Sequence, residues 1–594
     1  MTYNRGHDAS TRPGSAPARF LLVQSASQGR WRARTVAAGG GELQRSGVSE
    51  DADPNPFRDY RLSFAFEHAA SGTSVEVPGY FAADGDAAES SASAGGVWRA
   101  VLLPSKTGEW TYRASFRTGP DVALSEDLSD GAAAGFDGAS GSFTIHEPKG
   151  DAPGFYAQGL LEYTGERYLR FAGSGRYFLK GGADSPENFL GYADFDQTYD
   201  ADAGSGSYEH IGQVIHHYEP HVQDWKPGDP TWQGGKGKGI IGALNYLASK
   251  GMNSVYFLTY NLDGGDGRDV WPWSDLEVRH RYDVSKLDQW EVVFRHMDRL
   301  GLMLHVVTQE TENDHALGGG PGLNDVRKLY LRELIARFAH HPAVVWNLGE
   351  ENNTPDADRK AIAAYIRALD PYDHPITVHT HANKADTFYD GILGDPNFEA
   401  TSIQSLPERY YQEAFDLARR SAEAGRQWVI FHDEQNPASD GVLPDADDPD
   451  HDTIRTEALW GNLMGGGAGV EWYFGHQYPH MDINMEDWRS RDRMWDQTRY
   501  ALEFFREHLP FWEMTTEAGR ILRKGDEILA VQLPKGGTTS VRLGEGDYQV
   551  QWFDPRTGGD LIPGSGLSGP GEKRVGPPPS EPGKDWVALL TQTR

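Results

Sequence analysis

The feature that most constrains the fold is a change of hydrophobic period in the middle of the chain. Between about residues 238 and 473, apolar residues recur at helical spacing, and a short apolar run with strand character follows them. Residues 238–259 and 285–308 each show this order, with a glycine between helix and strand. A chain that repeats helix and strand in this way builds a parallel sheet covered by helices.

Eight apolar runs can be counted as strands of this sheet. Ser285 is expected to cap one of the helices between them, and Gly301 to end it. The count of eight, and the absence of a glycine-rich phosphate-binding turn after an early strand, favour a TIM (β/α)8 barrel over an open doubly wound sheet. The expected strands cover residues 177–179, 254–259, 303–308, 343–347, 376–379, 401–404, 429–433 and 469–473.

On both sides of this region, apolar residues recur at every second position, which is typical of strands with one buried face. Alternating runs lie at residues 60–67, 73–77, 97–103, 110–116 and 141–146, and again at 527–532, 538–543, 548–554 and 586–590. We therefore expect a multi-domain α/β plus β chain. It would have an N-terminal β-sandwich at 1–150, the barrel at 151–512 and a small C-terminal β-sandwich at 513–594.

The composition excludes several kinds of partner. With 56 Lys and Arg against 87 Asp and Glu, the net charge is −31, which disfavours nucleic acid and acidic membranes. There is no cysteine, so neither disulfides nor thiolate metal sites can form. No apolar run reaches the roughly 20 residues that span a bilayer. The polar N-terminus lacks the apolar segment of a secretory signal, which leaves the location open.

Polar residues gather where the expected strands end, and active sites of barrels lie at that end. Glu351 follows the fourth strand and Glu434 follows the seventh. Cleavage of a glycosidic bond needs one carboxylic acid to protonate the leaving oxygen and one carboxylate to attack carbon or to activate water. This pair predicts a glycoside hydrolase for a polysaccharide or oligosaccharide, with no metal and no cofactor. The residues expected to contact the substrate are Glu187, Tyr260, Glu350, His379, Gln404, His432 and Trp472.

Two strand ends resemble motifs of the large clan of glycosidases with barrel folds. The segment 344–352, VVWNLGEEN, resembles the fourth-strand motif in which Leu-Gly-Asn-Glu ends in the acid/base. Glu351 falls on that position, and Glu350 stands where the clan has Asn, which leaves both open as the acid/base. The segment 428–434, WVIFHDE, resembles the seventh-strand segment with the nucleophile, here Glu434. The resemblance implies a retaining mechanism.

The resemblance extends to the flanking regions of bacterial multi-domain glycoside hydrolases. Residues 55–57, 98–99 and 108–112 resemble an uncharacterised N-terminal β-domain found ahead of such barrels. Residues 546–558 and 585–587 resemble a C-terminal β-module that is named for collagen binding, although nothing in these residues specifies collagen. The resemblance implies a secreted or periplasmic protein.

Two other functions remain alternatives on the sequence. A polysaccharide lyase would need a Tyr, His or Lys base beside a group that neutralises a uronate, and the sequence offers no clear set. A barrel without catalysis would be a carbohydrate-binding protein.

Overall fold

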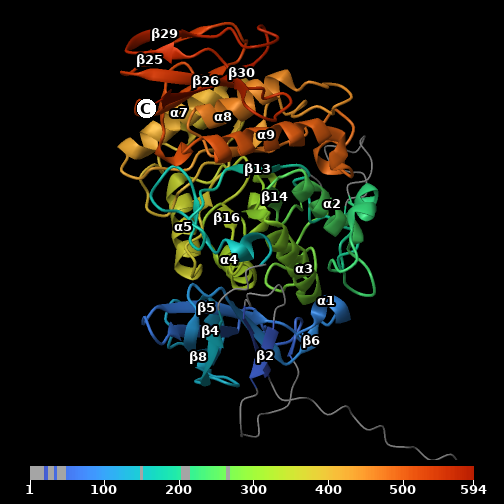
Figure 1. The fold of residues 1–594 in the computed structure, drawn as a ribbon. Helices are drawn as coiled ribbons and strands as arrows, with labels where there is room; N and C mark the ends of the chain where they lie inside the picture. Colours follow the sequence, from blue (N-terminus) through green and yellow to red (C-terminus); the bar gives the residue numbers. More distant parts are fainter. Residues whose placement is uncertain are drawn as a thin grey trace, which may run out of the picture.

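The computed structural model describes residues 48–146, 152–201, 215–262 and 268–593, and the backbone of 19–24 and 32–36. Figure 1 shows a β-rich region at each end and a barrel with helices around it in the middle. The expected fold class is therefore confirmed: an antiparallel β-sheet domain, a parallel β/α barrel and a second antiparallel β-sheet domain. None of the described helices is long and apolar enough to cross a membrane.

The N-terminal domain is built on a mainly antiparallel sheet in the order β10-β8-β4-β5-β7-β1-β2, with β9 beside β8. Side chains along β4 and β8 alternate between buried and exposed, which confirms the period-two prediction. Phe64, Trp98 and Phe116 fill the core of this domain. The bounds are β1 Arg19–Gln24, β2 Arg32–Val36, β4 Tyr60–His68, β5 Ser74–Phe81, β7 Val97–Leu102, β8 Gly108–Thr118, β9 Ala132–Ala133 and β10 Ser140–Ile145, with a separate pair β3 Val48–Ser49 and β6 Ala94–Gly95.

Eight strand positions close the barrel. Within the described residues, seven strands form one parallel sheet in the order β17-β16-β15-β14-β13-β21-β19. Parallel bridges from Ala400 to Val429 and from His379 to Ser402 insert the sixth position, and β18 pairs with β20 just beyond them. The bounds are β13 Lys180–Ala183, β14 Ser254–Leu258, β15 Met303–Val307, β16 Val344–Asn347, β17 Ile376–Thr377, β18 Gln404–Ser405, β19 Phe431–His432, β20 Glu434–Gln435 and β21 Gly469–Trp472.

Two details of the expected barrel are wrong. The first strand covers Lys180–Ala183 and not residues 177–179, and its first side chain can be buried because Asp433 and Glu471 neutralise the lysine. The cap of α3 is Asp283, whose carboxylate accepts from the Lys286 N–H at 2.9 Å, and not Ser285. Gly301 ends this helix in the left-handed conformation, as expected.

Amphipathic helices cover the barrel and connect it to both β-domains. Arg337 of α4 donates to the Phe81 carbonyl of β5 at 2.9 Å. On the opposite side, Phe504 of α9 packs on Phe553 of β26 with ring centroids 4.7 Å apart. In Figure 1 α3 and α4 face the N-terminal domain, and α7, α8 and α9 face the C-terminal domain. The bounds are α1 Ala87–Ser90, α2 Lys238–Ser249, α3 Val284–Leu300, α4 Asp325–Phe338, α5 Asp356–Leu369, α6 Ala385–Phe388, α7 Tyr410–Glu423, α8 Trp460–Met464 and α9 Asp492–His508.

The C-terminal domain has an antiparallel sheet in the order β22-β23-β24-β30-β26-β27, with β28 beside β26, and a separate pair of β25 and β29. It has a core of its own around Leu529, Trp552 and Trp586. The bounds are β22 Thr515–Glu517, β23 Ile521–Lys524, β24 Ile528–Leu533, β25 Thr539–Leu543, β26 Asp547–Phe553, β27 Ile562–Pro563, β28 Leu567–Ser568, β29 Gly571–Val575 and β30 Trp586–Thr593.

Candidate active site

The carboxyl ends of the barrel strands bring two glutamates together. Glu350 follows β16 after Gly349, whose φ of +142° suits glycine and where a Cβ would lie 2.7 Å from the Gln309 side chain. Glu434 begins β20, directly after β19. A carboxylate oxygen of Glu350, a ring nitrogen of His379 and a carboxylate oxygen of Glu434 all lie within 4.8 Å of one another, and all three residues are buried. We refer to these three residues as the mouth cluster.

Neighbouring side chains hold the Glu434 carboxylate in place. The Gln404 amide donates to Oε1, and His379 Nε2 lies 3.8 Å from Oε2. The Tyr410 hydroxyl donates to the Glu434 carbonyl at 2.8 Å. The orientation of this carboxylate is therefore set by groups from α7 and from strands five and six of the barrel.

His379 is neutral in this site. Burial, followed by the neighbouring His305 and His381, lowers the pKa of His379 to about 3. The backbone N–H of Glu351 approaches Nδ1 at 3.4 Å, so Nδ1 is the acceptor and Nε2 carries the proton. Nε2 lies 3.8 Å from Oε2 of Glu434, which is beyond hydrogen-bond distance, so His379 places a neutral N–H near the carboxylate without bonding it.

Glu351 has different surroundings from Glu350, although the two are adjacent in the chain. Its side chain is 37% exposed, and Oε2 lies 3.7 Å from Nδ1 of His381. Its backbone has φ +38°, which is rare for a residue with a side chain, and its carbonyl accepts from the Thr311 hydroxyl at 2.6 Å. The tight turn thus directs Glu350 into the mouth cluster and Glu351 to its edge.

Further acids lie around the mouth cluster. Burial, and then Glu350, Glu434 and Asp482, raise the pKa of Asp184 well above its ordinary value. The backbone N–H of Glu187 donates to Asp482 at 3.1 Å. The site is therefore rich in enclosed carboxylates, to which the first strand and the loop after the eighth strand contribute.

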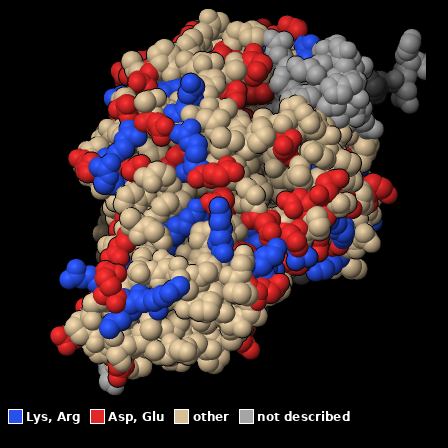
Figure 2. Space-filling model, turned by 90° about the horizontal axis from the view of Figure 1, so that it is seen from above, with Lys and Arg blue, Asp and Glu red and all other residues tan. Residues whose placement is uncertain are grey.

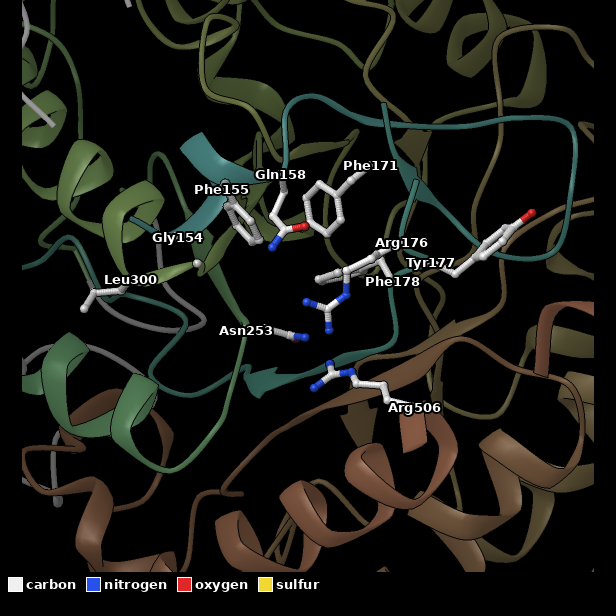
Figure 3. A pocket seen from close by; sticks show the side chains of 11 residues that line it. Gly154, Phe155, Gln158, Phe171, Arg176, Tyr177, Phe178, Asn253, Leu300 and Arg506 are labelled. Carbon is white, nitrogen blue, oxygen red and sulfur yellow. The ribbon is translucent and has the colours of Figure 1, made fainter. Parts of the chain in front are cut away.

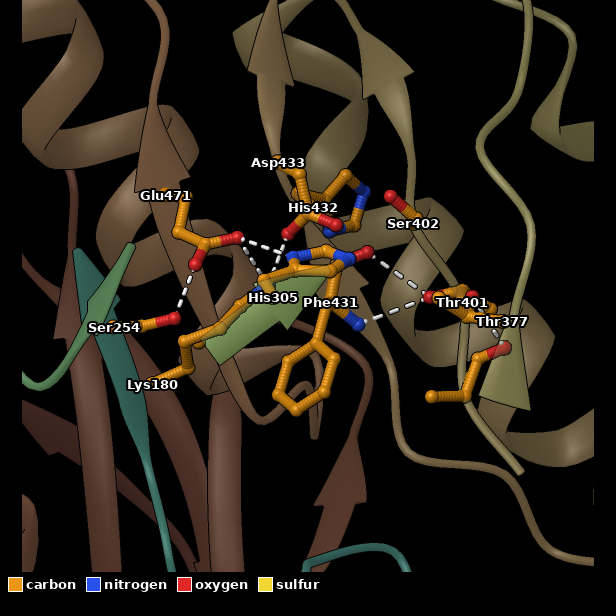
Figure 4. Close-up of polar contacts among 12 residues, drawn as sticks. Lys180, Ser254, His305, Thr377, Thr401, Ser402, Phe431, His432, Asp433 and Glu471 are labelled. Atoms are coloured by element: carbon orange, nitrogen blue, oxygen red, sulfur yellow. Dashed lines mark hydrogen bonds and ion pairs between the residues drawn. The ribbon is translucent and has the colours of Figure 1, made fainter. Parts of the chain in front are cut away.

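A network of buried charged side chains lies beneath the site, inside the barrel (Figure 4). Lys180 forms ion pairs with Asp433 and with Glu471, the latter at 2.9 Å, and all three are fully buried. Burial alone raises the pKa of Glu471, but Lys180 and then His305 hold it at about 2. Since Asp433 directly precedes Glu434, the ion pair with Lys180 fixes the strand end that carries Glu434.

The structure brings Glu187, Glu350, His379 and Gln404 to this region, but it does not bring three other expected contact residues there. Tyr260 donates to the Asn313 carbonyl at 3.0 Å and packs on Trp273. His432 and Trp472 also lie outside the site, which corrects the expectation that they contact the substrate. His432 hydrogen-bonds to Asn462 of α8 and to Glu413 of α7. The Trp472 ring N–H donates to the Thr498 hydroxyl of α9 at 2.9 Å.

The reason is the alternation of side chains along a strand. Asp433 and Glu471 point into the barrel, so their neighbours His432 and Trp472 point outward to the helices. The sequence also did not indicate Asp184, Asp482 or the buried Tyr256, whose ring centroid lies 6.0 Å from that of His379. For Asp184 a signal existed, because it directly follows the last residue of a strand in the same segment as Glu187.

Three groups of side chains in the described part of the chain have a spacing that could hold a metal ion. In the group of His305, Asp433 and Glu471, Lys180 already supplies the positive charge. The group of Glu291, His340 and His341 is balanced by Arg295, which lies 2.5 Å from Glu291. The third group is the mouth cluster itself.

A cavity of about 240 Å³ lies at the other end of the barrel. Figure 3 shows Arg176 and Arg506 reaching toward each other there, with Asn253 close by. Asn253 directly precedes β14, so the cavity is at the amino ends of the strands. Barrel enzymes use the carboxyl ends for catalysis, which separates this cavity from the mouth cluster.

Comparisons with known proteins agree with this architecture. Residues 41–117 match a sequence family described as DUF5060, a domain of unknown function. No curated protein matches the chain. A solved structure from Bacteroides vulgatus, provisionally described as a glycoside hydrolase, has 16% identity and a TM-score of 0.63, over 92% of this chain and 98% of its own.

Two more solved structures are similar over a smaller part of the chain. A glycoside hydrolase of family 5 from Bacteroides vulgatus has 14% identity and a TM-score of 0.51, over 74% of this chain and 94% of its own. Another glycoside hydrolase has 15% identity and a TM-score of 0.50, over 74% and 98%. The chain thus shares its fold with distant glycoside hydrolases.

Proposed function

We propose that this protein is a retaining glycoside hydrolase for a polysaccharide or oligosaccharide, with Glu434 as the nucleophile and Glu351 as the acid/base. The observation that carries the proposal is the mouth cluster, in which Glu350 and His379 enclose the Glu434 carboxylate at the carboxyl ends of the barrel strands. The likeness in fold to glycoside hydrolases supports it.

The reaction would proceed in two steps. Glu434 attacks the anomeric carbon while the acid/base donates its proton to the glycosidic oxygen, and the bond between the anomeric carbon and the glycosidic oxygen breaks. The same acid/base then takes a proton from water, which attacks the anomeric carbon and releases Glu434. The Gln404 amide would hold the Glu434 carboxylate through its hydrogen bond in both steps, with the neutral His379 ring beside it.

The surroundings of the two adjacent acids support this division of roles. The acid/base must meet first the leaving group and then a water molecule, and the side chain of Glu351 is 37% exposed. Glu350 is only 5% exposed and lies beside Glu434. Glu350 is therefore suited to orient the nucleophile or to bind a sugar hydroxyl.

We propose that the C-terminal domain braces the barrel and does not bind collagen. Arg455, in the π-helical segment Ile454–Leu459 that leads into α8, forms an ion pair with Asp585 at 2.9 Å, and both are buried. Arg520 of the same domain donates to the Thr456 carbonyl at 3.0 Å. These contacts lie against the helices that support strands seven and eight.

The test is release of reducing ends from a panel of plant, algal and bacterial polysaccharides. We expect the wild-type protein to cleave at least one of them and Glu434→Gln to lower the rate by on the order of 10⁴ or more. Glu408→Gln, in an exposed position after β18, is the control and should keep full activity. A product that absorbs in the ultraviolet would identify a lyase, and binding without cleavage would identify a carbohydrate-binding protein. Either result would overturn the proposal.

A further inference from the structure

Asp184 is a buried carboxylate without a hydrogen-bond donor among the described residues. It directly follows β13, is 1% exposed, and neither of its carboxylate oxygens has a partner. Its backbone N–H is bonded to the Trp472 carbonyl at 3.1 Å, so the position of the residue is fixed. An enclosed carboxylate with no donor is costly unless it holds a proton or a ligand supplies a donor.

The charged groups with the largest influence on Asp184 are all acidic. They are Glu350, Glu434, Asp482 and Glu471. The buried cation below the site, Lys180, is already paired with Asp433 and Glu471. Among the described residues, the groups that act most strongly on Asp184 include no cation, so a positively charged ligand group would be attracted there and a uronate or a sulfated sugar would be repelled.

Building on the proposed glycosidase activity, we propose that the glycan contains hexosamine residues with free amino groups and that Asp184 binds the ammonium group. An ammonium group offers three donors and a positive charge, and Asp184 offers two acceptor oxygens without donors. A hydrogen bond between two charged groups in an enclosed site is among the stronger polar contacts.

A metal ion fits this position less well than an ammonium group. The side chains here whose ligand atoms converge are Glu350, His379 and Glu434, and Asp184 is not one of them. A metal ion bound by that group would also occupy the Glu434 carboxylate. An ammonium group on Asp184 leaves Glu434 available for attack.

The inference is tested by calorimetry with hexamers of glucosamine and of galactosamine, each in its free-amine and its N-acetylated form. We expect one free-amine hexamer to bind wild-type protein at least 10-fold more tightly than its acetylated form. Asp184→Asn keeps the shape of the side chain but cannot carry a negative charge, and should lose this preference. The control Asp373→Asn should keep this preference, because Asp373 is exposed and precedes β17, at the amino end of that strand.

Several results would overturn the inference. Equal binding of the two forms, binding of neither free-amine hexamer, or an unchanged preference in Asp184→Asn would each contradict it. So would Mn²⁺ alone binding wild-type protein but not Asp184→Asn, because the site would then be a metal site.

Hydrolysis of the same hexamers separates this inference from the proposed function. Amine-dependent binding without any cleavage would refute the glycosidase and keep the role of Asp184. Cleavage of neutral glycans with no preference for amines would keep the glycosidase and refute the role of Asp184.

Discussion

Glu350 and Glu351 are adjacent in sequence but are suited to different tasks, because the turn after β16 directs only Glu350 toward Glu434. An acid/base matters most for substrates whose leaving group needs a proton. We expect Glu351→Gln to lower the rate on the natural glycan by about 10² to 10⁴, and to change the rate on activated aryl glycosides much less. In the shortened variant Glu351→Ala, azide should restore turnover of the aryl glycoside as a glycosyl azide, since a small anion can enter where the carboxyl group was.

Glu350→Gln is the matched comparison for this experiment. Loss of one hydrogen bond to the nucleophile or to the sugar should slow both kinds of substrate by a similar factor, about 10-fold to 100-fold. If Glu350→Gln shows the dependence on the leaving group and Glu350→Ala shows azide rescue, while the variants of Glu351 show neither, the two roles must be exchanged.

The candidate site was only partly predictable at the scale of single residues. The chemistry of glycoside hydrolysis and the ends of strands four and seven identified Glu350, Glu351 and Glu434. Tyr256 was missed because a Tyr inside an apolar strand carries no signal of its own, and Asp184 was missed although it directly follows a strand, because it is one acid among 87. Only the closed barrel brings them close to the glutamates.

At the scale of elements, the hydrophobic period and the positions of glycines predicted most strands and helices, but the direction of individual side chains was less predictable. His432 and Trp472 were placed in the site because they follow apolar runs, yet a shift of one residue turns a side chain outward. The start of β13 at Lys180 was not predicted, because a lysine is not expected inside a barrel unless carboxylates distant in sequence neutralise it.

The contact between the N-terminal domain and α3 should depend on pH. Burial, and then Asp283, raise the pKa of Glu50 from 4.5 to about 8, and Glu50 accepts from the Val284 N–H at 3.2 Å. The folded protein therefore keeps a proton that the unfolded chain releases. The resulting stabilisation is complete below about pH 4.5 and is lost as the pH rises through about 8, by at most about 1.4 kcal/mol per pH unit.

Thermal unfolding of Glu50→Gln between pH 4.5 and 9 measures this effect. The variant keeps an acceptor but cannot ionise, so its melting temperature should exceed that of the wild type at pH 8 to 9, and the difference should shrink toward pH 5. Glu67→Gln, on the exposed face of β4, is the control and should follow the wild type. A constant difference between Glu50→Gln and wild type at every pH would contradict the prediction.

At the scale of the whole molecule, the two β-domains lie on opposite sides of the barrel (Figure 1). The net charge of −31 does not form a single patch on the face in Figure 2, where acidic and basic side chains lie side by side. The number of domains and the fold class of each could be predicted from the sequence, since the hydrophobic period changes from one domain to the next. The packing of α3 and α4 on the N-terminal domain could not, because it depends on long-range contacts such as that of Arg337 with Phe81.

The most direct test of the account is the configuration of the first product, followed by proton NMR on a glycan that the panel identifies as a substrate. A nucleophile that forms a covalent intermediate gives two inversions at the anomeric carbon. We predict that the first anomeric signal has the configuration of the bond that was cleaved, and that the other anomer appears only later through mutarotation. A first product of the opposite configuration would contradict the assignment of Glu434 as a nucleophile.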